Sequence, residues 1–356
     1  MKKTAALFTA LIMILSLCAC TGDTDKIENT EIEGCEISVI DSSPEMKTGS
    51  IAEDTWNSVM KYAAENGLSC DYFNPDEASE DGYLKTISKA VEQGAGMIVL
   101  PGSCFEETAF EVQKQYPEVY FLILDGVPHN KKASYEISER TTGIVFAEEE
   151  AGYLAGYAAV SEGFSELGFI GESKAPEYKR YGYGFIQGAA AAAAETETRS
   201  KIRYAYADSK ASETAAGLAE EWYSGGTQII FVCGDEITPA VIKTASSSSN
   251  KVISADSAGS QSDDAVTAYV KKGIDAAVEK VVDGYADDRF IGGTAFNYAA
   301  KNDGIGLVMK EGAFSSFTDE QYDAVYAKLK NGKIQLKKDT NVKSEEELGN
   351  EWISIE

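Results

Sequence analysis

The feature that most constrains this chain is a regular alternation of short apolar runs with amphipathic segments of helical spacing. The runs, such as Val119–Leu124, are rich in Val, Ile, Leu and Phe. The segments between them place apolar residues at intervals of three and four, as at Leu84, Ile87 and Val91. Since consecutive parallel strands need a crossover connection, this alternation predicts parallel sheets with helices on both faces. We therefore expect an α/β fold.

The alternation occurs twice along the chain. The first series extends from Cys35 to Gly126, and a second one begins after residue 147 and reaches Ser254. A chain of 356 residues is long enough for two domains, each with its own core. We expect two doubly wound parallel-sheet lobes.

The N-terminal segment has the pattern of an export signal. Lys2 and Lys3 precede an apolar stretch from Ala5 to Leu17, which is too short for a comfortable membrane span. The following Leu-Cys-Ala-Cys sequence resembles the bacterial lipobox, with a small residue just before Cys20. We predict a signal peptide over 1–19, lipidation of Cys20 and a flexible polar tether over 20–34. Plain secretion without a lipid is the alternative.

The charge of the chain excludes several functional classes. Lys and Arg total 32 against 58 Asp and Glu, a net charge of −26. Nucleic-acid binding depends on basic patches that neutralise phosphates, so a nucleic-acid partner is not expected. The single histidine, His129, leaves little with which to build a zinc site or a Ser-His-Asp triad. We expect a protein that is not an enzyme, holds no cofactor or metal, and takes a neutral or weakly charged ligand.

Four cysteines follow the lipidation site, namely Cys35, Cys70, Cys104 and Cys233. Export permits disulfides, and Cys35 and Cys70 begin two runs that would be neighbouring strands, so a bridge between them is one possibility. Separate thiols are the other and the favoured one, because spacing alone does not fix connectivity.

Small and polar residues follow several of the predicted strands. In open α/β sheets, ligands bind outside the carboxyl ends of the strands. Two sheets that face each other would therefore form a cleft lined by such residues, among which Gly102, Ser103 and Asp235 are candidates. The full set of these strand ends is Pro101-Gly102-Ser103, Asp125-Gly126, Gly171-Glu172, Gly234-Asp235 and Asp256-Ser257.

Several segments, in order along the chain, resemble the basic membrane protein family. The most specific of them is Phe146 to Ala159, which is similar to the family's F-x-x-x-E-x-S-x-L-A-G-x-x-A helix. The family consists of substrate-binding lipoproteins that serve ABC importers, and its best-known members bind purine nucleosides. The other matching segments are Gly49 to Asn57, Gly168 to Gly188, Tyr206-Ala207-Asp208, Ile229-Ile230-Phe231, Ile253 to Asp256, Thr267 to Val278 and Gly304 to Leu307.

The resemblance implies which residues would meet a nucleoside. Trp56 and Tyr206 occupy the positions where the family presents aromatic faces to the base, although Trp56 could instead be a core or hinge residue. Asn57 could bind the edge of the base, cap the following helix, or do both. Asp256 and Lys271 would bind the sugar hydroxyls.

The sequence leaves the roles of three positions open, and one of them affects which ligand is preferred. Lys272 adjoins Lys271, so the register of the sugar-binding lysine is uncertain by one residue. Glu150 opens a predicted helix and could face the cleft. Lys47 occupies a position where purine-binding members carry an aspartate, so a donor replaces an acceptor there. An unpaired donor in a closed cleft costs on the order of 1–3 kcal/mol, which is enough to change the preferred ligand.

The resemblance also implies the domain boundaries of a type I periplasmic-binding-protein fold. Three segments would join the lobes, near Ile144 to Glu148, Ala255 to Gly259 and Gly292 to Asn297. The N-terminal lobe would then hold 35–146 plus 255–293, and the C-terminal lobe 147–254 plus 294–356.

Three functions remain to be weighed. The first is a monomeric, lipid-anchored solute-binding protein on the extracytoplasmic face of the cell membrane, which closes over a nucleoside-like ligand and docks on an ABC permease. The second is a ligand sensor for a membrane signalling receptor. The third, a nucleoside hydrolase, lacks an evident acid/base pair.

Overall fold

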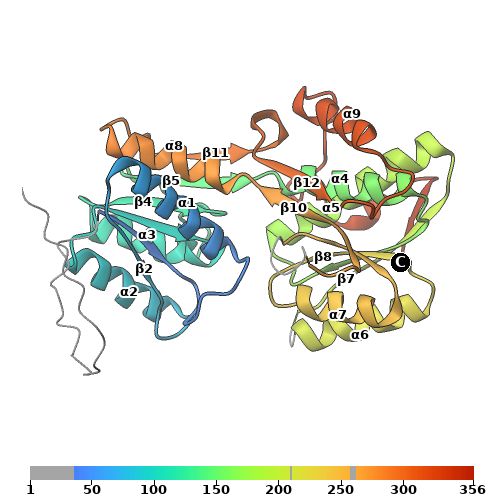
Figure 1. Cartoon of the computed structure of the whole chain (residues 1–356), viewed down its shortest axis with the longest axis horizontal. Helices are drawn as coiled ribbons and strands as arrows, with labels where there is room; N and C mark the ends of the chain where they lie inside the picture. The colour runs from blue at the N-terminus through green and yellow to red at the C-terminus, as the bar shows by residue number, and fades with distance from the viewer. Residues whose placement is uncertain (1–35, 209–210, 257–261) are drawn as a thin grey trace, which may run out of the picture. The chain divides into compact units, whose positions relative to one another are not determined.

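The computed structural model describes residues 36–208, 211–256 and 262–356 (Figure 1). The predictions for the signal peptide, Cys20, the tether and Cys35 lie outside these residues. Cys70, Cys104 and Cys233 each carry a free thiol.

The first sheet has six strands in the order β11-β5-β4-β3-β1-β2, and every neighbouring pair is parallel. Helices α1 and α8 cover one face, where they pack on residues such as Val39 and Val99, and α2 and α3 cover the other face around Ile98 and Phe121. The strands are β1 (Ile37–Ile40), β2 (Cys70–Phe73), β3 (Met97–Pro101), β4 (Tyr120–Leu124), β5 (Thr141–Phe146) and β11 (Thr294–Tyr298), and the helices are α1 (Ile51–Asn66), α2 (Glu80–Glu92), α3 (Glu106–Gln115), α8 (Ile274–Ala286) and the 3₁₀ turn η1 (Ser103–Phe105).

The second sheet has seven strands in the order β12-β10-β9-β8-β6-β7-β13. All neighbouring pairs are parallel except β10 and β12. Helices α4 and α5 cover one face and α6 and α7 the other (Figure 1). The strands are β6 (Glu166–Gly171), β7 (Ser200–Tyr206), β8 (Ile229–Cys233), β9 (Lys251–Ser254), β10 (Val266–Lys272), β12 (Ile305–Met309) and β13 (Ile353–Ile355), and the helices are α4 (Glu148–Glu162), α5 (Pro176–Thr196), α6 (Ala211–Ser224), α7 (Thr238–Ser248), α9 (Asp319–Lys330) and the turns η2 (Ala300–Asn302) and η3 (Glu345–Leu348).

The two-lobe α/β prediction is therefore confirmed, but two of the crossing points differ from those expected. The chain leaves the first sheet after Phe146, as expected. It returns only after Lys272, because β10 belongs to the second sheet, and it leaves again after Tyr298, because β11 pairs with β5 of the first. The sequence alone did not show which sheet an isolated strand would join, because that depends on pairing between segments far apart in the chain.

Helices α4 and α5 pack unusually close to each other through four glycines. An added Cβ would lie 2.0 Å from the Tyr181 carbonyl oxygen at Gly152, and 1.9 Å from the Tyr153 carbonyl oxygen at Gly188. Gly156 and Gly184 make equivalent approaches. Real Cβ atoms do not come this near to backbone oxygens, so these positions require glycine for packing. The close approach fixes α5, whose first turns lead into the site described below.

We expect Gly188→Ala to lower the free energy of unfolding by about 1–3 kcal/mol or more, because the new methyl group must push the two helices apart. The matched control is Gly217→Ala on α6, where a Cβ meets nothing within 4 Å. That change should raise the free energy of unfolding by about 0.5–1 kcal/mol, because alanine favours the helix. Urea denaturation of both variants checks this, and equal effects would contradict the packing argument.

Candidate functional site

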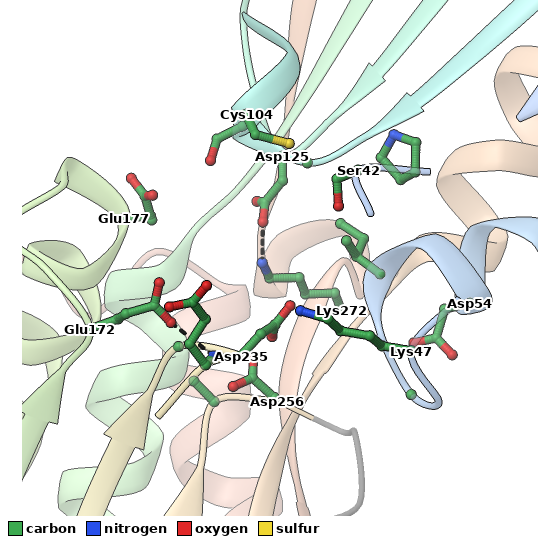
Figure 2. A pocket seen from close by; sticks show the side chains of 18 of the residues that line it. Ser42, Lys47, Asp54, Cys104, Asp125, Glu172, Glu177, Asp235, Asp256 and Lys272 are labelled. Atoms are coloured by element: carbon green, nitrogen blue, oxygen red, sulfur yellow. Dashed lines mark hydrogen bonds and ion pairs between the residues drawn. The ribbon is translucent and has the colours of Figure 1, made fainter. Parts of the chain in front are cut away.

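A cavity of about 380 Å³ lies at the carboxyl ends of strands from both sheets (Figure 2). The residues after β1, β3 and β4 line it from the first sheet, and those after β6, β8 and β9 line it from the second, together with the end of β10. This is the location expected for a ligand in open α/β sheets. The residues used below are Lys47, Asp54, Gly102, Ser103, Asp125, Glu172, Glu177, Tyr178, Tyr181, Asp235, Glu236, Asp256 and Lys272.

Lys272 forms the ion pair that joins the two sheets at this cavity. It is the last residue of β10, and its Nζ lies 2.5 Å from Oδ2 of Asp125, which follows β4 (Figure 2). Both side chains are about four-fifths buried. Burial alone would lower the pKa of Lys272, but Asp125, Tyr181 and Glu148 together raise it well above its usual value. The ammonium group therefore stays charged.

A second buried ion pair, between Glu148 and Arg180, lies close enough to the first to interact with it electrostatically. Glu148 begins α4 and its carboxylate accepts a hydrogen bond from Nε of Arg180 at 2.6 Å. Burial raises the pKa of Glu148, whereas Arg180 opposes that rise. Because Asp125 also raises the pKa of Glu148 and Lys272 lowers it, the two pairs interact electrostatically.

Three carboxylates gather on the side of the second sheet. Glu172, Asp235 and Asp256 follow β6, β8 and β9, and we call them the carboxylate cluster (Figure 2). Glu172 Oε2 accepts a hydrogen bond from the backbone N–H of Glu236 at 3.0 Å. Gly234 permits this approach, because its φ is +136° and an added Cβ would lie 2.4 Å from the Cβ of Glu172. Burial, followed by the charges of neighbouring carboxylates, raises the pKa of Glu172.

The surroundings of Asp256 favour its protonated form. Thr238 Oγ1 lies 2.9 Å from Asp256 Oδ2 and also 2.9 Å from the carbonyl oxygen of Gly234. The Thr238 hydroxyl is the donor in both contacts, and its hydrogen bond lowers the pKa of Asp256. Burial and then the neighbouring Asp235 outweigh that effect and raise the pKa of Asp256 well above its usual value.

Two tyrosines of α5 supply aromatic surface to the cavity. Tyr178 lies among the acidic residues, and burial, followed by Glu172 and Glu177, raises its pKa. Tyr181 is only 4% exposed, and its buried hydroxyl has no hydrogen-bond partner within the described structure. A buried polar atom without a partner is costly to the folded state, so this hydroxyl keeps an unused capacity for a hydrogen bond.

Five of the residues expected from the sequence line this cavity, namely Lys47, Gly102, Ser103, Asp235 and Asp256. Each comes from a strand end or from the turn before α1. The strand-end rule therefore led to the edge of the sheets where this cavity lies.

Trp56 and Asn57 are not among the residues that line the cavity. Helix α1 begins earlier than a cap at Asn57 requires, because the Ser50 side chain accepts a hydrogen bond from the N–H of Glu53. Trp56 therefore lies within α1 and packs against Tyr72, with ring centroids 5.4 Å apart, while Asn57 is exposed. The packing of Trp56 corresponds to the alternative of a core residue.

Tyr206, Lys271 and Glu150 also lie elsewhere. The hydroxyl of Tyr206 is 2.8 Å from that of Tyr204, and its ring meets the edge of Phe169. Lys271 is exposed, because successive side chains of a strand point to opposite faces and Lys272 takes the inward one. Glu150 accepts a hydrogen bond from the backbone N–H of Ala300 at 2.6 Å and so links two of the connections between the sheets.

Asp125 and Glu172 were among the strand ends that the sequence offered, although neither was singled out as a ligand contact, and Lys272 was the alternative to Lys271. Tyr178 and Tyr181 also line the cavity, and the sequence carries no comparable signal for them, since aromatic residues in a helix usually belong to the core.

Comparison with known proteins decides the family. Residues 36–340 match the family described as "ABC transporter substrate-binding protein PnrA-like". The chain belongs to this family. It is 25% identical over 315 residues to the ABC transporter nucleoside-binding protein BmpA of Lactococcus lactis subsp. cremoris, covering 81% of this chain and 84% of that one. It is 24% identical to basic membrane protein A of Borreliella afzelii, covering 72% and 79%.

The fold has a solved counterpart in an ABC transporter solute-binding protein from Aeropyrum pernix. The TM-score is 0.66 at 17% identity, with 88% of this chain and 90% of that chain covered. The predicted family and type I periplasmic-binding fold are thus confirmed, and the protein is a solute-binding component of an ABC transporter and not an enzyme. None of the described helices is long and apolar enough to cross a membrane.

We expect Asp256→Asn to raise the melting temperature of the ligand-free protein by a few degrees at pH 7–8, and to have little effect near pH 4. A carboxyl whose pKa is raised by folding costs stability as the pH rises above its unfolded value near 4, and asparagine removes that cost. The side-chain oxygen of the asparagine can still accept the hydrogen bond from Thr238. Thermal melts across this pH range check the expectation.

The matched control is Asp264→Asn, which removes an exposed carboxylate at the opposite edge of the same sheet. It should leave the melting temperature unchanged at every pH. A loss of stability in Asp256→Asn that is the same at pH 4 and pH 8 would count against a protonated Asp256.

Proposed function

We propose that this protein binds a nucleoside-like molecule in the cavity between its two sheets and delivers it to the permease of an ABC importer. The observation that supports this most strongly is the convergence of Lys272, Asp125, Asp256 and Tyr181 at the strand ends of both sheets. The printed name of the Lactococcus lactis relative, a nucleoside-binding protein, agrees with it. A volume of about 380 Å³ suits a molecule of this size.

The polar groups suit a sugar ring. Lys272 is a donor that stays charged, and Asp125 and Asp256 offer carboxyl oxygens within the same cavity. A pair of neighbouring hydroxyls can donate to a carboxylate and accept from an ammonium group. The unpartnered hydroxyl of Tyr181 would gain a hydrogen bond from the ligand.

The aromatic groups suit a flat base. In this proposal Tyr178 takes the stacking role that the sequence assigned to Trp56 and Tyr206, since it lines the cavity and they do not. Stacking on an aromatic face contributes about 1–3 kcal/mol per base. Lys47, Gly102 and Ser103 also line the cavity and remain proposed ligand contacts.

The mechanism follows from the connections between the sheets. Three chain crossings, after Phe146, Lys272 and Tyr298, join the lobes. A ligand that contacts both lobes favours their closure, and the closed form is the one that a permease would select. The export signal and the Cys20 lipidation pattern support anchorage on the extracytoplasmic face of the membrane.

The direct test is mass spectrometry of the small molecule that co-purifies with the protein, followed by calorimetric titration of the ligand-free form with adenosine, guanosine, inosine and cytidine. Micromolar or tighter binding of a nucleoside supports the proposal. Co-purification of a ligand without a base, together with no binding of these four nucleosides, would refute it.

We expect Lys272→Met to weaken nucleoside binding about tenfold or more, because the sugar loses a charged donor. The matched control is Lys271→Met, which removes the adjacent lysine from the exposed side of the same strand. It should change the dissociation constant less than about twofold. Calorimetry on both variants checks this, and the reverse order of effects would restore the original assignment to Lys271.

We expect Tyr178→Ala to weaken nucleoside binding about tenfold, since the base loses its aromatic face. Trp56→Phe should leave the affinity unchanged, because Trp56 packs on Tyr72 and does not line the cavity. Titration of both variants with the same nucleoside checks the pair. A loss of binding in Trp56→Phe at unchanged melting temperature would contradict the assignment.

A further inference from the structure

We propose that Glu106 is a positioning residue of the ligand site, and that His129 holds its carboxylate in place. Together they keep the turn after β4 in the conformation that presents Asp125 to Lys272 and to the ligand. Neither Glu106 nor His129 is among the residues that line the cavity. This inference rests on the ligand-binding function proposed above and extends it to residues behind the cavity wall.

Asp125 has a backbone conformation that a residue other than glycine adopts only at a cost. Its φ is +63°, in the left-handed region, where the Cβ of an ordinary side chain is crowded. Such a conformation persists when the surrounding contacts determine it. Here it occurs directly after the end of β4, and the carboxylate of the same residue pairs with Nζ of Lys272 (Figure 2). The turn after β4 therefore needs partners that keep it in place.

The side chain of Glu106, the first residue of α3, is one of these partners. Its Oε1 accepts a hydrogen bond from the backbone N–H of Val127 at 2.8 Å, two residues after Asp125. The carboxylate can come this close because residue 126 is glycine, where an added Cβ would lie 2.8 Å from Cγ of Glu106. Gly126 donates its own N–H to the carbonyl oxygen of Ile144 at 3.2 Å. The turn is thus held both by α3 and by β5.

His129, the single histidine of the chain, fixes the Glu106 carboxylate. Its Nε2 lies 3.1 Å from Oε2 of Glu106, and its backbone N–H donates to the Glu106 carbonyl oxygen at 3.3 Å. The other ring nitrogen lies 2.9 Å from the carbonyl oxygen of Asn130, and the ring meets that of Tyr135 edge-on. Burial raises the pKa of Glu106, whereas the Val127 N–H and His129 oppose that rise, so both contacts favour the carboxylate form.

The first test removes these contacts one at a time in the full chain. Calorimetric titration with adenosine, guanosine, inosine and cytidine should show that Glu106→Ala weakens nucleoside binding about five- to tenfold, because Asp125 is no longer held in place. Glu106→Gln should retain most of the affinity, since its amide oxygen can still accept from Val127. His129→Phe, which keeps a ring beside Tyr135, should weaken binding about two- to threefold.

The matched control is Glu162→Ala in the other lobe. The Glu162 carboxylate also holds a backbone turn, since it accepts hydrogen bonds from the N–H groups of 315–317, but none of these residues lines the cavity. This variant should keep the affinity within about twofold of the unchanged protein, even where it lowers the melting temperature as much as Glu106→Ala does.

A double-mutant cycle separates the positioning of Asp125 from a general loss of stability. Asp125→Asn suits the left-handed conformation but removes the charge. If Glu106 acts through the Asp125 carboxylate, Glu106→Ala should weaken binding only about twofold or less in that background. In the ligand-free Glu106→Ala protein, hydrogen exchange should be at least about fivefold faster at the Gly126 amide, whose partner Ile144 is unaltered.

Two results would overturn the positioning role and leave the nucleoside-binding function standing. One is an unchanged affinity in Glu106→Ala, and the other is an equal loss of affinity with and without the Asp125 carboxylate. Failure of all four nucleosides to bind the unchanged protein would instead refute the nucleoside function. The exchange rate at Gly126 then decides whether Glu106 holds the turn, and an unchanged rate would refute that as well.

Discussion

The ion pair between Lys272 and Asp125 is the interaction on which the site depends. It joins the last residue of a strand in the second sheet to a residue that follows a strand in the first, so it connects the two sheets at the edge where a ligand would bind. A buried ammonium group is stable only with compensating charges, and the carboxylates of Asp125 and Glu148 supply them. The same residues thus hold the lobes together and present a charged donor to the cavity.

The packing of the second lobe explains why these groups can meet. Gly152, Gly156, Gly184 and Gly188 let α4 and α5 approach until backbone touches backbone. That approach brings Arg180 of α5 to Glu148 at the start of α4, beside the first connection between the lobes. Tyr178 and Tyr181 precede the glycines on the same helix and are directed to the cavity. A packing constraint far from the ligand therefore positions the aromatic groups.

Much of the fold was predictable, because strand–helix alternation is a local property of the sequence and dictates parallel sheets. The edge that bears the site was also predictable, since it follows from strand direction, and Asp235 and Asp256 lie there as expected. The failures have local causes. A one-residue register decides between Lys271 and Lys272. The Ser50 cap starts α1 at Ile51, so Trp56 lies within the helix and packs against Tyr72. The sheet that β10 and β11 would join depends on long-range pairing, which no local pattern specifies.

The central claim is that the ligand lies between the strand ends of the two sheets and contacts both lobes there. The most direct measurement is a crystal structure of the protein with its co-purified ligand in place. We predict ligand atoms within hydrogen-bonding distance of Lys272 and of the Tyr181 hydroxyl, with a ring against Tyr178. A ligand that stacks on Trp56 or Tyr206, or that contacts one lobe only, would contradict the account.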